Sequence, residues 1–112
     1  MRKFLIDTDT GSDDAVALMM ALRHPDIEIE AITVVAGNVP MKQGAQNALY
    51  TVELCGKSVP VYEGLAKPLV VELHTAQETH GEDGMGDIGL DVYGRQPAEG
   101  HAVQVILDTI RA

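Results

Sequence analysis

The chain has 112 residues, of which 46% are hydrophobic and only 4% aromatic, and its 17 acidic and 8 basic residues give a formal net charge of −9. This length predicts a single domain over residues 1–112 with an aliphatic core. The acidic balance argues against nucleic acid and anionic membranes as partners, because both attract basic surfaces.

Cysteine content and the N-terminal residues predict the compartment. The only cysteine, Cys55, has no internal disulfide partner, which indicates a reducing compartment and favours a role as a small apolar residue in a helix. Only three apolar residues, 4–6, follow the basic pair at positions 2 and 3, too few for a secretory signal. No stretch approaches the length of a membrane span. We therefore expect a soluble, cytoplasmic protein.

Apolar periodicity and helix-end signals divide the chain into alternating strands and helices. Asp13 is expected at the start of the first helix, as N-cap or in the first turn, where acidic side chains favour the positive end of the helix dipole. The expected elements, in chain order, are a short buried strand over 3–7, a helix over 13–23, a strand over 27–36 that is edge-like and then buried, a helix over 41–55, a short strand over 58–62 and a helix over 102–112.

Residues 64–100 are expected to form a long mobile loop, because six glycines lie between positions 81 and 100 among acidic residues. Such a loop is either a lid or binding segment or a disordered excursion, and the sequence favours neither. Strands that alternate with helices predict an α/β fold with an open, mostly parallel, Rossmann-like sheet, right-handed crossovers and flanking helices.

Four aspartates lie within eight residues, from Asp7 to Asp14, directly after the first expected strand. Ligands of parallel sheets bind outside the carboxyl ends of the strands, and Asn38 falls at the same edge. Like charges this close require compensation, and carboxylates are natural ligands of Ca²⁺ and Mg²⁺. An EF-hand is excluded, because the twelfth loop position counted from Asp7 is Leu18, where a glutamate is needed. Acidic helix caps would explain one or two of the aspartates and not all four.

The stretch from Asp7 to Ala15, with its preceding strand, resembles the N-terminal signature of the inosine–uridine-preferring nucleoside hydrolases. Further similar segments follow in the same order, at 33–38, 61–69, 79–86 and 97–102. The resemblance covers essentially the whole chain. Members of that family are much longer, so the chain resembles the N-terminal part of a nucleoside hydrolase fold.

The resemblance implies a Ca²⁺-dependent ribonucleoside hydrolase that cleaves the N-glycosidic bond of purine or pyrimidine nucleosides to base and ribose. It implies that Asp9 and Asp14 hold Ca²⁺, that Asp7 supports the metal shell, and that Asp9 is also the general base. A bound cation and a carboxylate activate water at neutral pH, and nearby carboxylates stabilise the positive charge that develops on the ribosyl ring.

The resemblance further implies that Asp13 and Asn38 bind the ribose, and that His80 lies near the leaving base or on a closing lid. From residue types alone, the alternative for Asn38 is a turn residue, and the alternative for His80 is an ordinary loop histidine. The sequence does not decide which base is preferred.

Two other functions remain open from the sequence. One is a non-catalytic remnant or association module that has kept the metal loop. The other is a Mg²⁺ phosphatase of the haloacid dehalogenase type, which also begins with a strand and Asp-x-Asp but expects threonine where this chain has Gly11. Because the predicted sheet is incomplete, we expect the isolated chain to bind metal weakly, to hydrolyse nucleosides poorly and to form a homo-oligomer through uncovered apolar surface.

Overall fold

Three parallel strands form the centre of the computed structural model, which describes residues 1–112. The strand order is β1-β2-β3, and both pairs of neighbours are parallel. The elements are β1 (Arg2–Thr8), α1 (Ser12–Arg23), β2 (Ile27–Val34), α2 (Met41–Leu54), β3 (Val61–Glu63), α3 (Gln77–His80) and α4 (Ala102–Arg111). The predicted α/β class with an open parallel sheet is confirmed.

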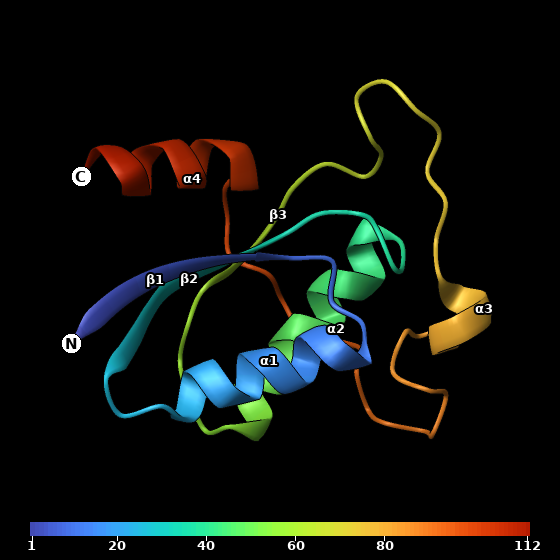
Figure 1. Cartoon of the computed structure of the whole chain (residues 1–112), viewed down its shortest axis with the longest axis horizontal. Helices are drawn as coiled ribbons and strands as arrows, with labels where there is room; N and C mark the ends of the chain where they lie inside the picture. Colours follow the sequence, from blue (N-terminus) through green and yellow to red (C-terminus); the bar gives the residue numbers. More distant parts are fainter.

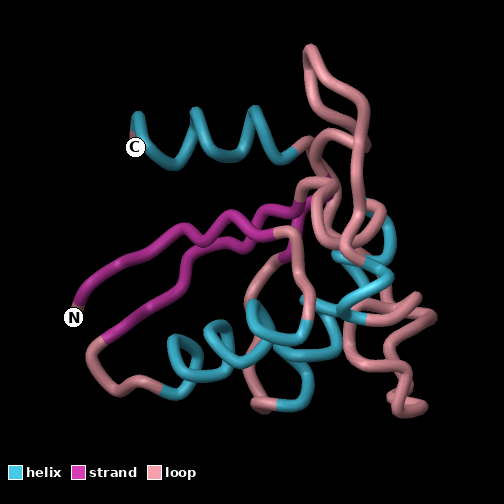
Figure 2. The backbone as a smooth tube through the Cα atoms, turned by 45° about the vertical axis from the view of Figure 1, so that its right-hand side comes forward, coloured by secondary structure: helices cyan, strands magenta, loops and turns pink.

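The helices cover both faces of the sheet. Figure 1 shows α1 and α2 together on one face and α4 alone on the other, and the rotated view in Figure 2 agrees. The ends of α1 and α2 lie where local chemistry predicts. Gly11 precedes α1, His24 caps its C-terminal end, and Gly56, with φ of +67°, follows α2. The predicted helix ends are therefore confirmed to within one or two residues.

The hydrophobic core lies between β2 and the pair α1 and α2. Ile32 and Val34 of β2 are fully buried, and they pack with Leu18 of α1 and Ala45 of α2. The start of β2 is partly exposed and its end is buried, as predicted from the change from alternation to an apolar run. This strand is therefore the central element of the sheet.

Two predictions about local structure are wrong. The first strand is not buried: β1 is the edge of the sheet, and of its residues only Thr8 is buried. The third strand begins at Val61 rather than at residue 58, because Pro60 has no N–H to donate to the ladder. Cys55 caps α2 and, although only partly buried, packs against the hydrophobic core, so its predicted role as a small apolar residue is confirmed at the end of the helix.

The segment 64–100 contains the short helix α3, which the sequence did not predict, and it returns repeatedly to the body of the protein. The Ala76 N–H donates to the Asn38 carbonyl at 2.7 Å, and the Ala98 N–H donates to the Val61 carbonyl at 2.8 Å. These anchors show that the segment packs on the body of the protein and is not a disordered excursion. No helix of the structure combines the length and apolar character needed to cross a membrane.

Ile32→Ala should lower the free energy of unfolding by about 3 kcal/mol, because it leaves a cavity beneath two helices. The matched control is Val16→Ala in α1, since Val16 is 53% exposed, and its effect should stay within about 0.5 kcal/mol. Urea unfolding followed by circular dichroism measures both. Equal effects of the two substitutions would contradict the assignment of β2 as the core strand.

Candidate functional site

The aspartate loop joins the carboxyl end of β1 to the first turn of α1. Asp9 and Asp14 are partly buried, whereas Asp13 is exposed in the first turn of the helix. The Gly11 N–H donates to Asp14 Oδ2 at 3.3 Å, which satisfies a free N–H at the helix start. The loop therefore presents carboxylates at the edge of the sheet where parallel folds bind ligands.

Asp9 is held by the segment that follows β2. The backbone N–H of Asn38 donates to Asp9 Oδ2 at 2.9 Å. A Cβ atom at position 37 would lie 2.2 Å from the same carboxylate oxygen, so only glycine fits there. Gly37 is therefore required by close approach to Asp9 and not by backbone conformation.

Asn38 also connects Asp9 to Asp14. Its side-chain amide Nδ2 lies 3.4 Å from Asp14 Oδ2, while its backbone N–H binds Asp9. Burial raises the pKa of Asp14, the adjacent Asp9 carboxyl raises it further, and the Gly11 N–H opposes both effects. The structure thus brings together Asp9, Asp14 and Asn38, three of the residues that the sequence analysis selected.

Asp7 lies apart from this pair. Its Oδ1 accepts a hydrogen bond from Thr33 Oγ1 at 2.6 Å, and the residue lines a small cavity of about 110 Å³ beneath α4, beside Ala102. No group of three or more His, Cys, Asp or Glu side chains is positioned to hold a metal ion. The part of the site formed by this chain therefore consists of two carboxylates, without a third ligand of these types beside them.

A second loop packs against the aspartate loop. His80 ends α3 and its carbonyl accepts from the Gly86 N–H at 2.8 Å. The 81–87 loop then turns through Gly84, which packs against Gly11: a Cβ at position 84 would lie 3.6 Å from the Gly11 Cα. This contact places the segment containing His80 at the same edge of the sheet as the carboxylates.

The 81–87 loop is held by its own acidic side chains. Asp83, which is buried, accepts from the N–H groups of Met85 and Asp87 at 2.8 and 3.1 Å. In return, the N–H groups of Asp83 and Glu82 donate to Asp87 and lower the pKa of its carboxyl. These two aspartates therefore satisfy backbone donors of the loop.

Asn47 is a structural residue of the site that the sequence analysis missed. This side chain of α2 is fully buried, and its Nδ2 donates to the Thr10 carbonyl at 2.9 Å and to the Asp83 carbonyl at 2.7 Å. One amide thereby joins the two loops to a core helix. The available signal was an asparagine between Ala45 and Ala48, on the apolar side of a predicted helix.

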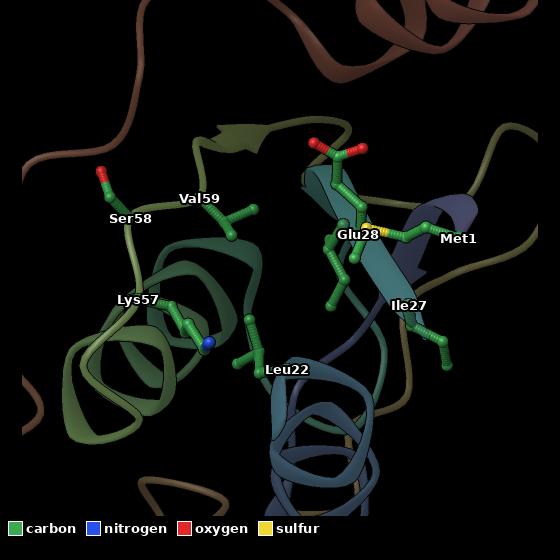
Figure 3. Close-up of a pocket in the computed structure, with 8 residues that line it drawn as sticks. Met1, Leu22, Ile27, Glu28, Lys57, Ser58 and Val59 are labelled. Carbon is green, nitrogen blue, oxygen red and sulfur yellow. The ribbon is translucent and has the colours of Figure 1, made fainter. Parts of the chain in front are cut away.

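Four other grooves lie away from the two carboxylates. Figure 3 shows one of about 280 Å³, in which Leu22 from the end of α1 lies near Val59 and Ile27. This groove is at the amino ends of the strands, opposite the carboxylates, and it has no charged pair comparable to Asp9 and Asp14. It is therefore not the candidate site.

Asn47→Ala should lower the free energy of unfolding by about 2–4 kcal/mol, because it leaves two buried carbonyls without a donor. The rate of backbone amide hydrogen exchange should increase selectively in the two loops that Asn47 joins. Gln104→Ala is the control: its side chain bonds only to Asp108 on the exposed side of α4, and it should change stability by less than about 0.5 kcal/mol. Unchanged exchange in both loops would contradict the bridging role.

Asp14→Asn should make the protein more stable at neutral pH. Because the pKa of Asp14 is raised above its ordinary 3.8, wild-type stability falls as the pH rises from 3.8 through the raised pKa. The Asp14→Asn variant does not lose stability in this way. Its free energy of unfolding should therefore exceed that of the wild type at pH 7, and this difference should be absent below pH 3.8. Urea midpoints across this range, with the exposed Asp26→Asn as control, measure it; a variant less stable at pH 7 would contradict the prediction.

Comparison with known proteins identifies the family. Residues 4–112 match the model of the inosine-uridine preferring nucleoside hydrolases. The chain is 39% identical over 111 residues to a pyrimidine-specific ribonucleoside hydrolase of Escherichia coli, a match that covers 99% of this chain and 36% of that protein. It is 44% identical over 110 residues to an uncharacterised protein of Schizosaccharomyces pombe, covering 97% of this chain and 36% of that one.

Solved structures agree with the sequence match. The fold superposes on a purine-preferring ribonucleoside hydrolase from Gardnerella vaginalis with a TM-score of 0.89 and 35% identity, covering 98% of this chain and 36% of that one. The chain thus spans about a third of the length of the relatives it matches. The matched range, the shared fold and the aspartate loop lead to one conclusion: this chain belongs to the inosine-uridine preferring nucleoside hydrolase family.

Proposed function

We propose that this chain supplies the ribose- and metal-binding part of a Ca²⁺-dependent ribonucleoside hydrolase, which cleaves the N-glycosidic bond to give a free base and ribose. The observation that supports this most is the joint positioning of Asp9 and Asp14 by Asn38 at the carboxyl end of β1. Family membership favours it over the phosphatase alternative. The non-catalytic association module is the remaining alternative.

The donor set fits Ca²⁺. Both candidate ligands are carboxylates, the hard oxygen donors that this cation prefers, and a cation beside them would relieve the unfavourable charge that raises the pKa of Asp14. Two carboxylates supply at most four of the six to eight oxygens of a Ca²⁺ shell, so further ligands come from outside this pair. When bound, the cation would lower the pKa of a coordinated water.

The residues of this chain would divide the chemistry among them. Asp9 would accept the proton of the attacking water, and the Asn38 N–H holds its carboxylate in place for that step. Asp13 and the Asn38 amide would bind ribose hydroxyls and orient the sugar. The negative charge of the carboxylates around the sugar would stabilise the positive ribosyl ring as the glycosidic bond breaks.

His80 would act on the leaving-group side. It lies at the C-terminal end of α3, ahead of the loop that packs against Gly11. A protonated or hydrogen-bonding imidazole near the departing base would stabilise the negative charge that the base acquires. The relatives named for pyrimidine and for purine nucleosides match this chain similarly, so base preference would depend on residues other than the aspartate loop.

Asp9→Asn should lower kcat/KM for inosine or uridine hydrolysis by about 10²–10⁴, the usual cost of losing a general base. Calorimetric titration should show at least about tenfold weaker Ca²⁺ binding for the same variant, because a ligand charge is lost. Asp26→Asn is the matched control, since Asp26 is exposed in the turn before β2, and it should change neither quantity by more than about twofold.

Three outcomes separate the alternatives. A loss of both nucleoside hydrolysis and Ca²⁺ affinity in the Asp9→Asn variant supports the hydrolase. Ca²⁺ binding that depends on Asp9, without any nucleoside hydrolysis when the wild-type sequence replaces the matching third of the Escherichia coli hydrolase, favours the association module. Hydrolysis that is unaffected by Asp9→Asn would contradict the role assigned to this residue.

A further inference from the structure

His80 lies on a helix that is too short to be stable by itself. The helix α3 has four residues, Gln77–His80, and an isolated helix of that length does not persist in water. Figure 1 shows it apart from the other helices. Its internal support is small, since the N–H groups of Thr79 and His80 share the Ala76 carbonyl, at 2.9 and 2.8 Å. Contacts with neighbouring segments must therefore hold His80 in place.

One hydrogen bond fixes the beginning of α3. The Ala76 N–H donates to the Asn38 carbonyl at 2.7 Å, and Asn38 is the residue that contacts both Asp9 and Asp14. The start of the helix is thus joined through a single residue to the carboxylate pair. One hydrogen bond fixes a point and not an orientation, so a second contact is needed to hold the end of the helix, where His80 lies.

The side chain of Gln77 supplies that second contact. Its Oε1 accepts from the Thr75 hydroxyl at 3.0 Å, and its Nε2 donates to the Glu82 carbonyl at 2.8 Å and lies 3.4 Å from Glu82 Oε2. Thr75 precedes α3 and Glu82 follows it, so one amide bridges the segments on either side of the helix. Glutamine can form this bridge because its amide carries both an acceptor and two donors. The loop that the bridge closes contains His80.

The turn after His80 is held from the same residue. The Gly81 N–H donates to the Gln77 carbonyl at 2.8 Å. Gly81 has a φ of +90°, and a Cβ at this position would lie 2.6 Å from Asp87 Oδ2, so the turn requires glycine. The His80 carbonyl accepts from the Gly86 N–H at 2.8 Å. The imidazole therefore projects from backbone that is bonded on both sides, and Gln77 supports that backbone with its carbonyl and its side chain.

We propose that Gln77 is a positioning residue, which holds His80 in place for its action on the leaving base. The action of His80 rests on the proposed function; the bridge itself rests only on the hydrogen bonds of Gln77. A misplacement of about 1 Å in a catalytic group costs up to about a hundredfold in rate, so loss of the bridge should lower kcat. Calcium affinity should stay unchanged, because Gln77 contacts neither Asp9 nor Asp14.

The kinetic experiment uses a chimeric enzyme in which this sequence replaces the matching third of the Escherichia coli hydrolase. Gln77→Met keeps the length of the side chain and removes its hydrogen-bonding groups. We expect this variant to hydrolyse uridine with a kcat about tenfold lower and a KM within about twofold of the wild type. Glu78→Met is the matched control, since Glu78 is exposed in the same helix, and it should change kcat by less than about twofold.

A double-mutant cycle separates positioning from a general structural effect. In a His80→Ala background, Gln77→Met should lower kcat by less than about twofold, because no imidazole is left to misplace. Hydrogen exchange tests the bridge on this chain directly. Exchange of the Gly81 amide, which donates to the Gln77 carbonyl, should accelerate at least about tenfold in Gln77→Met and stay unchanged in Glu78→Met.

The outcomes distinguish this proposal from the proposed function. If the wild-type chimera is active, an unchanged kcat in Gln77→Met, an equal loss in the wild-type and His80→Ala backgrounds, or unchanged Gly81 exchange would each overturn the role of Gln77 and leave the hydrolase assignment intact. A wild-type chimera without any hydrolysis would overturn the proposed function and, with it, the catalytic role of this bridge.

Discussion

The approach of the Asp9 carboxylate to the Gly37–Asn38 backbone is the contact on which the site depends. Parallel pairing brings the ends of β1 and β2 together, and the Asn38 N–H then bonds to the Asp9 carboxylate at 2.9 Å. The absence of a side chain at position 37 makes that distance possible. Two carboxylates could not otherwise be held in a partly buried position, because burial and mutual repulsion both disfavour their charged forms.

The hydrophobic core also determines where the loops of the site lie. Asn47 projects from a helix that packs on β2, and its two hydrogen bonds hold the loops of residues 10 and 83 at fixed positions. Loops supported by a buried polar group in this way are more precisely placed than loops that rest on their own contacts. The geometry near Asp9 therefore depends on the packing of α2 as well as on the local sequence.

Local patterns predicted the element types, the helix ends and the shared location of Asp9, Asp14 and Asn38, because periodicity and parallel topology determine these features. The exposure of β1 was missed, since its apolar residues alone do not say whether a neighbouring strand covers them. Asn47 and the short helix α3 were missed because their positions depend on contacts between segments 36 or more residues apart. The roles assigned to all six site residues are predictions from the family resemblance: Asp7, Asp9, Asp13, Asp14, Asn38 and His80.

The raised pKa of Asp14 and the open edge of β1 have a common physical explanation. A carboxylate pair without a counter-charge lowers the stability of the fold at neutral pH, and an edge strand without a partner leaves backbone groups unpaired. The open edge runs along β1, and the carboxylate pair lies in the loop and the helix start that follow its carboxyl end. A cation and a neighbouring strand would each remove one of them. Under the proposed function, folding stability in this part of the protein would thus be coupled to cation binding.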